Sequence, residues 1–132
     1  MVAAGWGRII SVSGLAARQA GSVAGSVRNV AVAAMTKNLA DELGPDGINV
    51  TVVHPGSTVT ERTAGLVSQL ASANNTTEEE ARARLASASS IGRMVTADEV
   101  AAVVTFLASP LSVAINGDAI AVGGGARGAI HY

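Results

Sequence analysis

The sequence contains no cysteine, and its aromatic residues amount to one Trp, one Tyr and one Phe. The lack of cysteine excludes disulfide bonds and thiolate metal ligands. Its two histidines, His54 and His131, have no second ligand nearby at metal-binding spacing, so we expect no metal site. No apolar run reaches the ~18 residues of a membrane-spanning helix, and the N-terminus lacks the segments of a secretion signal. We therefore expect a cytoplasmic protein that does not enter a membrane.

Charge is also scarce and nearly balanced, with 9 Lys and Arg residues, 10 Asp and Glu residues and a formal net charge of −1. There is no basic stripe interleaved with aromatic residues, so nothing in the sequence indicates nucleic-acid binding. Apolar residues make up 48% of the 132 residues, and Ala and Val supply far more of them than aromatics do. Small side chains bury little area each, so we expect one compact unit stabilised by many modest contacts.

The first half of the sequence alternates between strand and helix patterns. Residues 8–13 are short and rich in β-branched side chains between two glycines, which predicts a strand. Residues 22–43 have helical periodicity and end at Gly44-Pro45. The expected apolar face of this helix consists of Val23, Val27, Val30, Ala34 and Leu39. Residues 48–53 are the clearest strand, which His54-Pro55-Gly56 is expected to end.

The second half is predicted to be mainly helical before a last strand. One helix is expected at about residues 60–73, and a second begins at Thr77. A loop follows at residues 87–93, and Thr96 to Glu99 form a capping box that opens a helix reaching residue 107. Residues 119–122 form the last strand, and the glycines after it suggest a flexible tail. Strands alternating with helices predict an α/β fold with a parallel sheet.

Five segments stand in an informative order. They are a strand ending in serine (7–13), the end of a long helix (36–43), a strand with a Pro-Gly turn (47–56), a loop and helix (92–109) and a last strand (116–124). Together they resemble the short-chain dehydrogenase/reductase family over essentially the whole chain. The resemblance implies the C-terminal half of a Rossmann-like, doubly wound parallel sheet, with about three parallel strands and flanking helices. It further implies that residues 1–132 form a single partial domain without the nucleotide-binding N-terminal half.

The resemblance also locates the residues expected to carry the chemistry. The family transfers hydride between NAD(P) and carbonyl or alcohol groups, and it uses a tyrosine as proton donor with a lysine four residues later. In this sequence the two positions fall on Gly25 and Asn29, and neither residue can replace the pair. The catalytic serine corresponds to Gly14, or to Ser13 if the register slips by one residue. We therefore expect a truncated oxidoreductase-type chain that is inactive alone.

Three other residues are candidates for a substitute role. Arg28 lies near the altered helix positions, and the alternative is a solvated or interface arginine. His54 ends a strand where ligands bind in open α/β sheets, and the alternative is a space-filling role. Tyr132 is the only tyrosine, and it could reach a site only in a neighbouring subunit of an oligomer.

The turn after the second strand is the candidate cofactor contact. Pro55 and Gly56 are followed by Thr58 and Thr60 in the family's spacing, so the resemblance implies contacts to NAD or NADP at these four residues. Alternatively, Thr60 caps the next helix. By the same resemblance, residues 58–90 would cover an unidentified small-molecule substrate.

Finally, the resemblance implies a homo-oligomer, either a dimer or a tetramer. In the family, the helix equivalent to residues 22–43 packs in one subunit interface and the last strand forms another. A strand at residues 8–13 left at the edge of the sheet would add a further pairing surface. The alternative function is therefore a non-catalytic interaction module that pairs with itself or with an intact relative.

Overall fold

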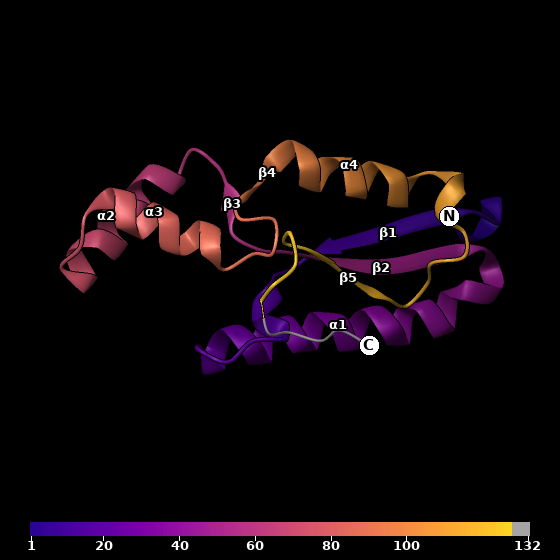
Figure 1. Ribbon diagram of the computed structural model, residues 1–132. Coiled ribbons are helices and arrows are strands. Elements are labelled where there is room, and N and C mark those ends of the chain that lie inside the picture. Colours follow the sequence, from indigo (N-terminus) through magenta and orange to yellow (C-terminus); the bar gives the residue numbers. More distant parts are fainter. Residues whose placement is uncertain (128–132) are drawn as a thin grey trace.

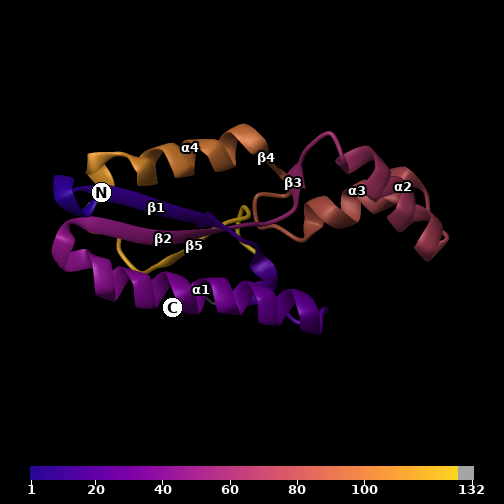
Figure 2. The ribbon, with the colours of Figure 1, turned by 180° about the vertical axis from the view of Figure 1, so that it is seen from behind.

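The computed structural model describes residues 1–127, which form a parallel sheet covered by a helix on each face (Figures 1 and 2). The sheet contains β1 (Gly7–Val12), β2 (Ile48–Pro55) and β5 (Ala119–Val122) in the spatial order β1-β2-β5. Helix α1 (Val23–Leu43) covers one face, and α4 (Ala97–Ala108) covers the other. The expected α/β class with three parallel strands and flanking helices is confirmed.

Two further helices project beyond the carboxyl ends of the strands. They are α2 (Thr63–Asn74) and α3 (Glu78–Ser87), and we refer to them together as the lid. The chain enters the lid through β3 (Thr58–Val59) and leaves it through β4 (Val95–Thr96), which pair in parallel. The remaining elements are four short 3-10 turns at Val2–Ala4, Leu15–Ala17, Gly44–Asp46 and Pro110–Ser112.

Strand β2 is the centre of the sheet. It pairs with β1 along one edge, beginning with Ile48 opposite Gly7, and with β5 along the other, ending with Pro55 opposite Val122. Every residue from Ile48 to His54 is buried. A strand that is covered on both faces has a nearly continuous β-branched run, which is why it was predictable. It extends two residues further than predicted, because its last two residues, His54 and Pro55, pair with Ala121 and Val122 of β5.

Helix α1 has the predicted bounds but buries a different face. The Ser22 hydroxyl accepts a hydrogen bond from Gly25 N and thereby caps its first turn. Val23, Val27 and Val30, which were expected in the core, are 84%, 66% and 50% exposed. The buried positions are Asn29, Thr36 and Ala40, with Ala40 packed against Ile48 and Val50. Of the expected face, Leu39 does pack against this cluster, whereas the three valines form an exposed stripe on the outside of the helix.

Local capping signals set the starts of α3 and α4 as predicted. Thr77 and Glu80 form a capping box at α3, and Thr96 and Glu99 form another at α4. Helix α2 begins at Thr63 instead of Thr60, because the Thr63 hydroxyl accepts a hydrogen bond from Thr60 N and the intervening residues form a turn.

The glycine-rich segment after β5 was expected to be a flexible tail, and for residues 123–127 this prediction is wrong. We call these residues the strap and residues 88–91, which follow α3, the lid base. Four hydrogen bonds join the two segments: Ser90 N to Gly125 O at 2.7 Å, Ile91 N to Gly124 O at 3.1 Å, Arg127 N to Ala88 O at 3.2 Å and Arg127 Nε to Ser89 O at 3.3 Å. Gly124 and Gly125 have φ values of 68° and 78°, which explains why glycines are needed there.

Among the described residues, no helix is both long and apolar enough to cross a membrane. The same part of the chain contains no group of three or more His, Asp or Glu side chains that could hold a metal ion.

The ion pair at the start of α4 predicts a specific acid response. Two Arg93 nitrogens donate to the Glu99 carboxylate at 2.6 and 2.8 Å, and Thr96 N donates to it at 2.8 Å. These hydrogen bonds, that from Arg93 foremost, lower the pKa of Glu99 from 4.5 to about 2. A lowered carboxyl pKa adds stability above pH 4.5 that is lost as the pH falls toward 2. We predict that the difference in Tm between wild type and Glu99→Gln narrows from pH 6 to pH 2, as measured by thermal melts at about those pH values.

Arg93→Met serves as the second arm of this experiment, because it removes the main cause of the shift and leaves the Thr96 cap in place. A difference in Tm between wild type and Glu99→Gln that stays constant from about pH 6 to about pH 2 would contradict the lowered pKa of Glu99.

Candidate functional site

The carboxyl edge of the sheet is where the predicted site residues gather. Open α/β sheets bind ligands at this edge. Here the ends of β1, β2 and β5 meet around the Pro55-Gly56 turn, with Gly56 N donating to Val122 O at 3.0 Å. A Cβ on Gly56 would lie only 2.7 Å from the Gly123 Cα and 3.2 Å from Leu15 Cδ1. The turn is therefore closely packed between the end of β5 and the first 3-10 turn after β1.

Ser13 continues the β1–β2 ladder by donating from its backbone N to Val53 O at 2.9 Å. Alternation along the strand places its side chain on the same face as Ile9, which packs in the core beneath α1. Its hydroxyl is buried, and among the described residues it has no hydrogen-bond partner. Ser13 therefore faces the α1 layer, and its catalytic role stays a prediction.

Asn29 occupies the expected lysine position, and its side chain is held in the core. It is 6% exposed, and its Nδ2 donates to Gly14 O at 3.3 Å. Its Oδ1 accepts a long hydrogen bond from Arg28 Nε at 3.5 Å. A Cβ on Gly14 would approach the Asn29 Nδ2 to 3.3 Å, which is tight. The small residue Gly14 thus leaves room for the Asn29 carboxamide. We call the hydrogen bond from Asn29 to Gly14 O, which joins α1 to the end of β1, the clasp.

Gly25, at the expected tyrosine position, lies in the first turn of α1 and offers no side-chain donor. A Cβ there would meet the Ser22 Oγ at 3.1 Å and the Ala16 Cβ at 3.6 Å. The capping residue of the helix thus lies directly beside this position.

Thr58 and Thr60 both have their hydroxyl groups engaged in local hydrogen bonds. The Thr58 hydroxyl donates to Gly56 O at 3.0 Å and fixes the turn. The Thr60 hydroxyl accepts from Arg62 N at 3.3 Å, so its own proton can still be donated to a ligand. Thr60 is not the N-cap of α2, because Arg62 holds that position.

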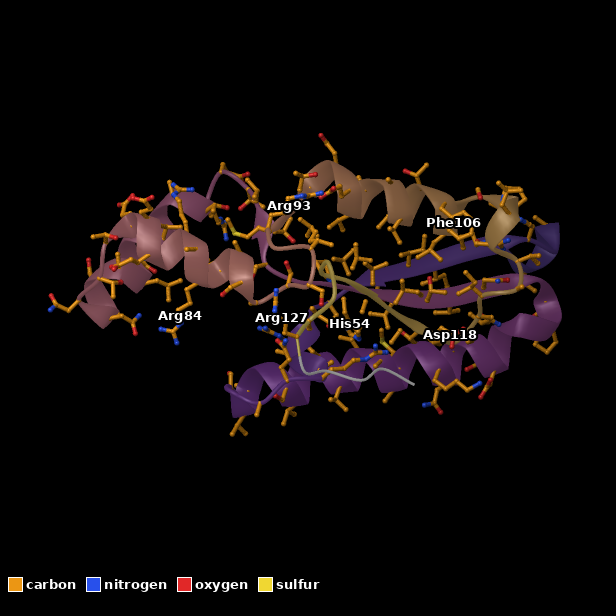
Figure 3. All side chains as sticks on the ribbon, viewed as in Figure 1. His54, Arg84, Arg93, Phe106, Asp118 and Arg127 are labelled. Atoms are coloured by element: carbon orange, nitrogen blue, oxygen red, sulfur yellow. The ribbon has the colours of Figure 1, made fainter. Side chains whose placement is uncertain are left out.

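The substitute candidates differ in accessibility. His54 is 1% exposed and lies between the sheet and α1 (Figure 3), where no substrate reaches it without rearrangement of the core. Arg28 is exposed on α1. The aromatic side chains of Trp6 and Phe106 are 47% and 43% exposed, and the Arg8 guanidinium lies 5.0 Å from the ring centre of Trp6. Tyr132 lies outside the described residues.

Three contacts near this edge had no signal in the sequence. Arg18 reaches from the loop after β1 to Ala119 O at 2.8 Å, on the outer edge of β5. Leu15 is buried over the two glycines of the edge. The strap anchors the lid base beside them. Each contact joins residues distant in sequence, so local patterns could not reveal it.

A separate cavity of about 550 Å³ lies between the two lid helices. Its lining includes the apolar residues Leu70, Ala81 and Leu85 and the charged residue Arg84. In Figure 3, Arg84 points away from α3 on the α1 side of the molecule. The cavity contains none of the residues predicted to contact a cofactor, so it is distinct from the carboxyl edge.

Comparison with known proteins decides the family. A family model described as enoyl-(acyl carrier protein) reductase matches residues 1–127. The chain belongs to the short-chain dehydrogenase/reductase family. The short-chain reductase protein NovJ of Streptomyces niveus is 38% identical over 122 residues, which cover 92% of this chain and 45% of NovJ. The 3-oxoacyl-[acyl-carrier-protein] reductase FabG of Aquifex aeolicus is 34% identical over 127 residues, which cover 95% of this chain and 47% of FabG.

Solved structures give the same assignment. L-sorbose reductase from Gluconobacter frateurii, crystallised with NADPH and L-sorbose, aligns with a TM-score of 0.86 at 26% identity, covering 98% of this chain and 51% of that one. YwfH, an NADPH-dependent reductase involved in bacilysin biosynthesis, aligns with a TM-score of 0.88 at 29% identity, covering 98% and 50%. The chain thus spans about half the length of the relatives it matches.

The clasp at Asn29 predicts a stability effect larger than its single hydrogen bond suggests. Asn29→Ala removes one hydrogen bond from the Gly14 carbonyl, which keeps the one from Ala17 N at 3.2 Å, and it leaves a void at a position that is only 6% exposed. We therefore expect a loss of about 1–3 kcal/mol in the free energy of unfolding. The matched control is Asn38→Ala on the same helix, where an exposed side chain donates to Ala34 O at 2.8 Å. Urea titration should show a loss of only about 0.5 kcal/mol for the control. Equal losses for the two variants would contradict the clasp.

Proposed function

We propose that this chain is a nicotinamide-type oxidoreductase polypeptide whose own residues do not complete hydride transfer, so that it has little or no activity alone. The proposal rests on the residues at the positions expected to hold the family's tyrosine and lysine, Gly25 and Asn29. Gly25 has no proton to give, and the Asn29 carboxamide is neutral, buried and bound to Gly14 O. A general acid typically contributes about 10²–10⁴-fold to the rate, so its loss is severe.

The residues of the carboxyl edge fit a dinucleotide cofactor incompletely. The Thr60 hydroxyl retains a proton that can be donated to a phosphate oxygen, and Thr58 shapes the turn beneath it. The positive charge that would meet the cofactor ribose is missing, because Asn29 replaces lysine. The glycine-rich segment at residues 123–127 follows the last strand and forms the strap, so it does not cradle a pyrophosphate at a helix N-terminus. We therefore assign no catalytic step to a bound cofactor here.

This proposal predicts that the purified chain binds neither NADH nor NADPH tightly. We expect no saturation below about 1 mM in a fluorescence or calorimetric titration, and no oxidation of NADPH with a panel of ketones and aldehydes. A full-length NADPH-dependent relative serves as the positive control under the same conditions. A dissociation constant well below millimolar, or turnover of any carbonyl above the buffer rate, would overturn the proposal.

A second function, an interaction module, is favoured by two exposed surfaces. Val23, Val27 and Val30 form a stripe at helical spacing on the outside of α1. At the sheet edge, Gly7 and Ser13 donate to β2, so the alternate residues of β1 direct their backbone groups away from it. Val12 at this edge is 63% exposed. Exposed apolar stripes and open strand edges favour pairing with another chain, either a second copy or an intact relative.

The valine stripe predicts a homodimer or tetramer at micromolar concentration. Val27→Glu introduces a charge at the centre of the stripe, so we expect it to weaken self-association by at least about tenfold. Val113→Glu is the matched control, because Val113 is 67% exposed and lies outside α1. Light scattering and sedimentation measure both variants. A monomeric wild type, or equal weakening by the two substitutions, would count against the module.

A further inference from the structure

The lid has a hydrophobic core of its own. Val67, Ala71 and Ala81 are buried together, with Leu70 and Leu85 packed against them. The core beneath α1 is a separate cluster that includes Ala40, Ile48 and Val50. Because α2 and α3 pack on each other, the lid can keep its internal structure while its position relative to the sheet changes. Its position must then be set by the segments that attach it.

One attachment is a narrow neck. The segments that enter and leave the lid pair through only two residue positions, Thr58 opposite Val95 and Val59 opposite Thr96. Ser57 O also accepts from Val95 N at 3.1 Å. A two-position ladder aligns the two segments with each other, but it resists rotation of the lid poorly. Figures 1 and 2 show the lid extending from this neck beyond the sheet.

The other attachment is the strap, which is anchored firmly at its sheet end. Gly123 follows β5 directly and lies against Gly56, so close that a Cβ on Gly123 would be 3.0 Å from the Gly56 Cα. At its far end the strap holds the lid base through the four hydrogen bonds described above. A Cβ on Gly124 would lie 2.7 Å from Ile91 Cδ1 and Cγ1. The strap and the lid base are therefore in close contact, and this contact requires a glycine at position 124.

We infer that the strap is a latch for the lid. It fixes the lid base to the rigid carboxyl edge of the sheet, and its release lets α2 and α3 swing as one body about the β3–β4 neck. The swing would change access to the Pro55-Gly56 turn, because β3, one side of the neck, begins two residues after Gly56. The last strand thus positions the lid through the residues that follow it, although it shares no core with the lid.

The test uses Gly124→Ala in the full chain. The substitution places a side chain at φ 68° and drives its Cβ into Ile91, so it should release the strap. Because the chain has no native cysteine, Gln69→Cys on the lid and Thr105→Cys on α4 allow specific spin labelling at two exposed positions. We expect a narrow distance distribution in the otherwise wild-type chain and a clearly broadened one with Gly124→Ala. Hydrogen exchange at Ser90 and Ile91 should rise at least about tenfold, while α2, α3 and β2 keep their protection.

Two controls separate latch release from general destabilisation. Gly5→Ala places a Cβ at a similar φ of 60° with no atom within 4 Å, at the opposite end of the sheet. It should leave the distance distribution narrow. Adding Ile91→Ala to Gly124→Ala removes the clash but keeps the strain of an alanine at φ 68°, so it should narrow the distribution in part. If Gly124→Ala does not fold, Arg127→Ala, which removes the hydrogen bond to Ser89 O, decides by the same readouts.

An unchanged distribution in the strap variant would overturn the inference. So would equal broadening with Gly5→Ala, or loss of protection throughout α2 and α3, which would mean that the lid unfolds instead of swinging.

Discussion

The pairing of β2 along both of its edges is the constraint on which the rest of the structure depends. Its residues from Ile48 to His54 are all buried, so both faces need a covering helix and both edges need a strand. Helix α1 and helix α4 supply the two layers, and β1 and β5 supply the edges. The carboxyl ends of the strands then meet at one edge, where the Pro55-Gly56 turn, the strap and the neck of the lid all begin.

The functional consequence lies at the junction of α1 with that edge. In the family resemblance, this junction carries the lysine and the serine that act with the tyrosine. In this chain the expected positions fall on Asn29 for the lysine and on Gly14, or Ser13 after a one-residue register slip, for the serine, and a hydrogen bond joins Asn29 to Gly14. The Asn29 side chain thus joins α1 to the end of β1. Replacing Asn29 alone with a charged residue would also bury that charge beside the Gly14 carbonyl, which is costly without a partner.

Much of the fold was predictable because its signals are local. The β-branched run of β2 and the Thr96/Glu99 capping box are readable within a few residues, and both are confirmed. The valine stripe of α1 was placed on the wrong side, because periodicity shows that residues share a face but not which face meets the sheet. The strap was missed because its order comes from hydrogen bonds to residues more than thirty positions away. Gly25 and Asn29 were located through the family resemblance. The hydrogen bond from Asn29 to Gly14 O was not predictable, because it joins residues fifteen positions apart.

NMR of the Asn29 carboxamide protons tests the structural role of this side chain most directly. A buried amide bound to the Gly14 carbonyl predicts two side-chain resonances that exchange slowly with water and show nuclear Overhauser contacts to the Gly14–Leu15 backbone. Rapid exchange without those contacts would mean that the carboxamide points to solvent. In that case the side chain at the lysine position would be available to a ligand, contrary to the structural role assigned to it.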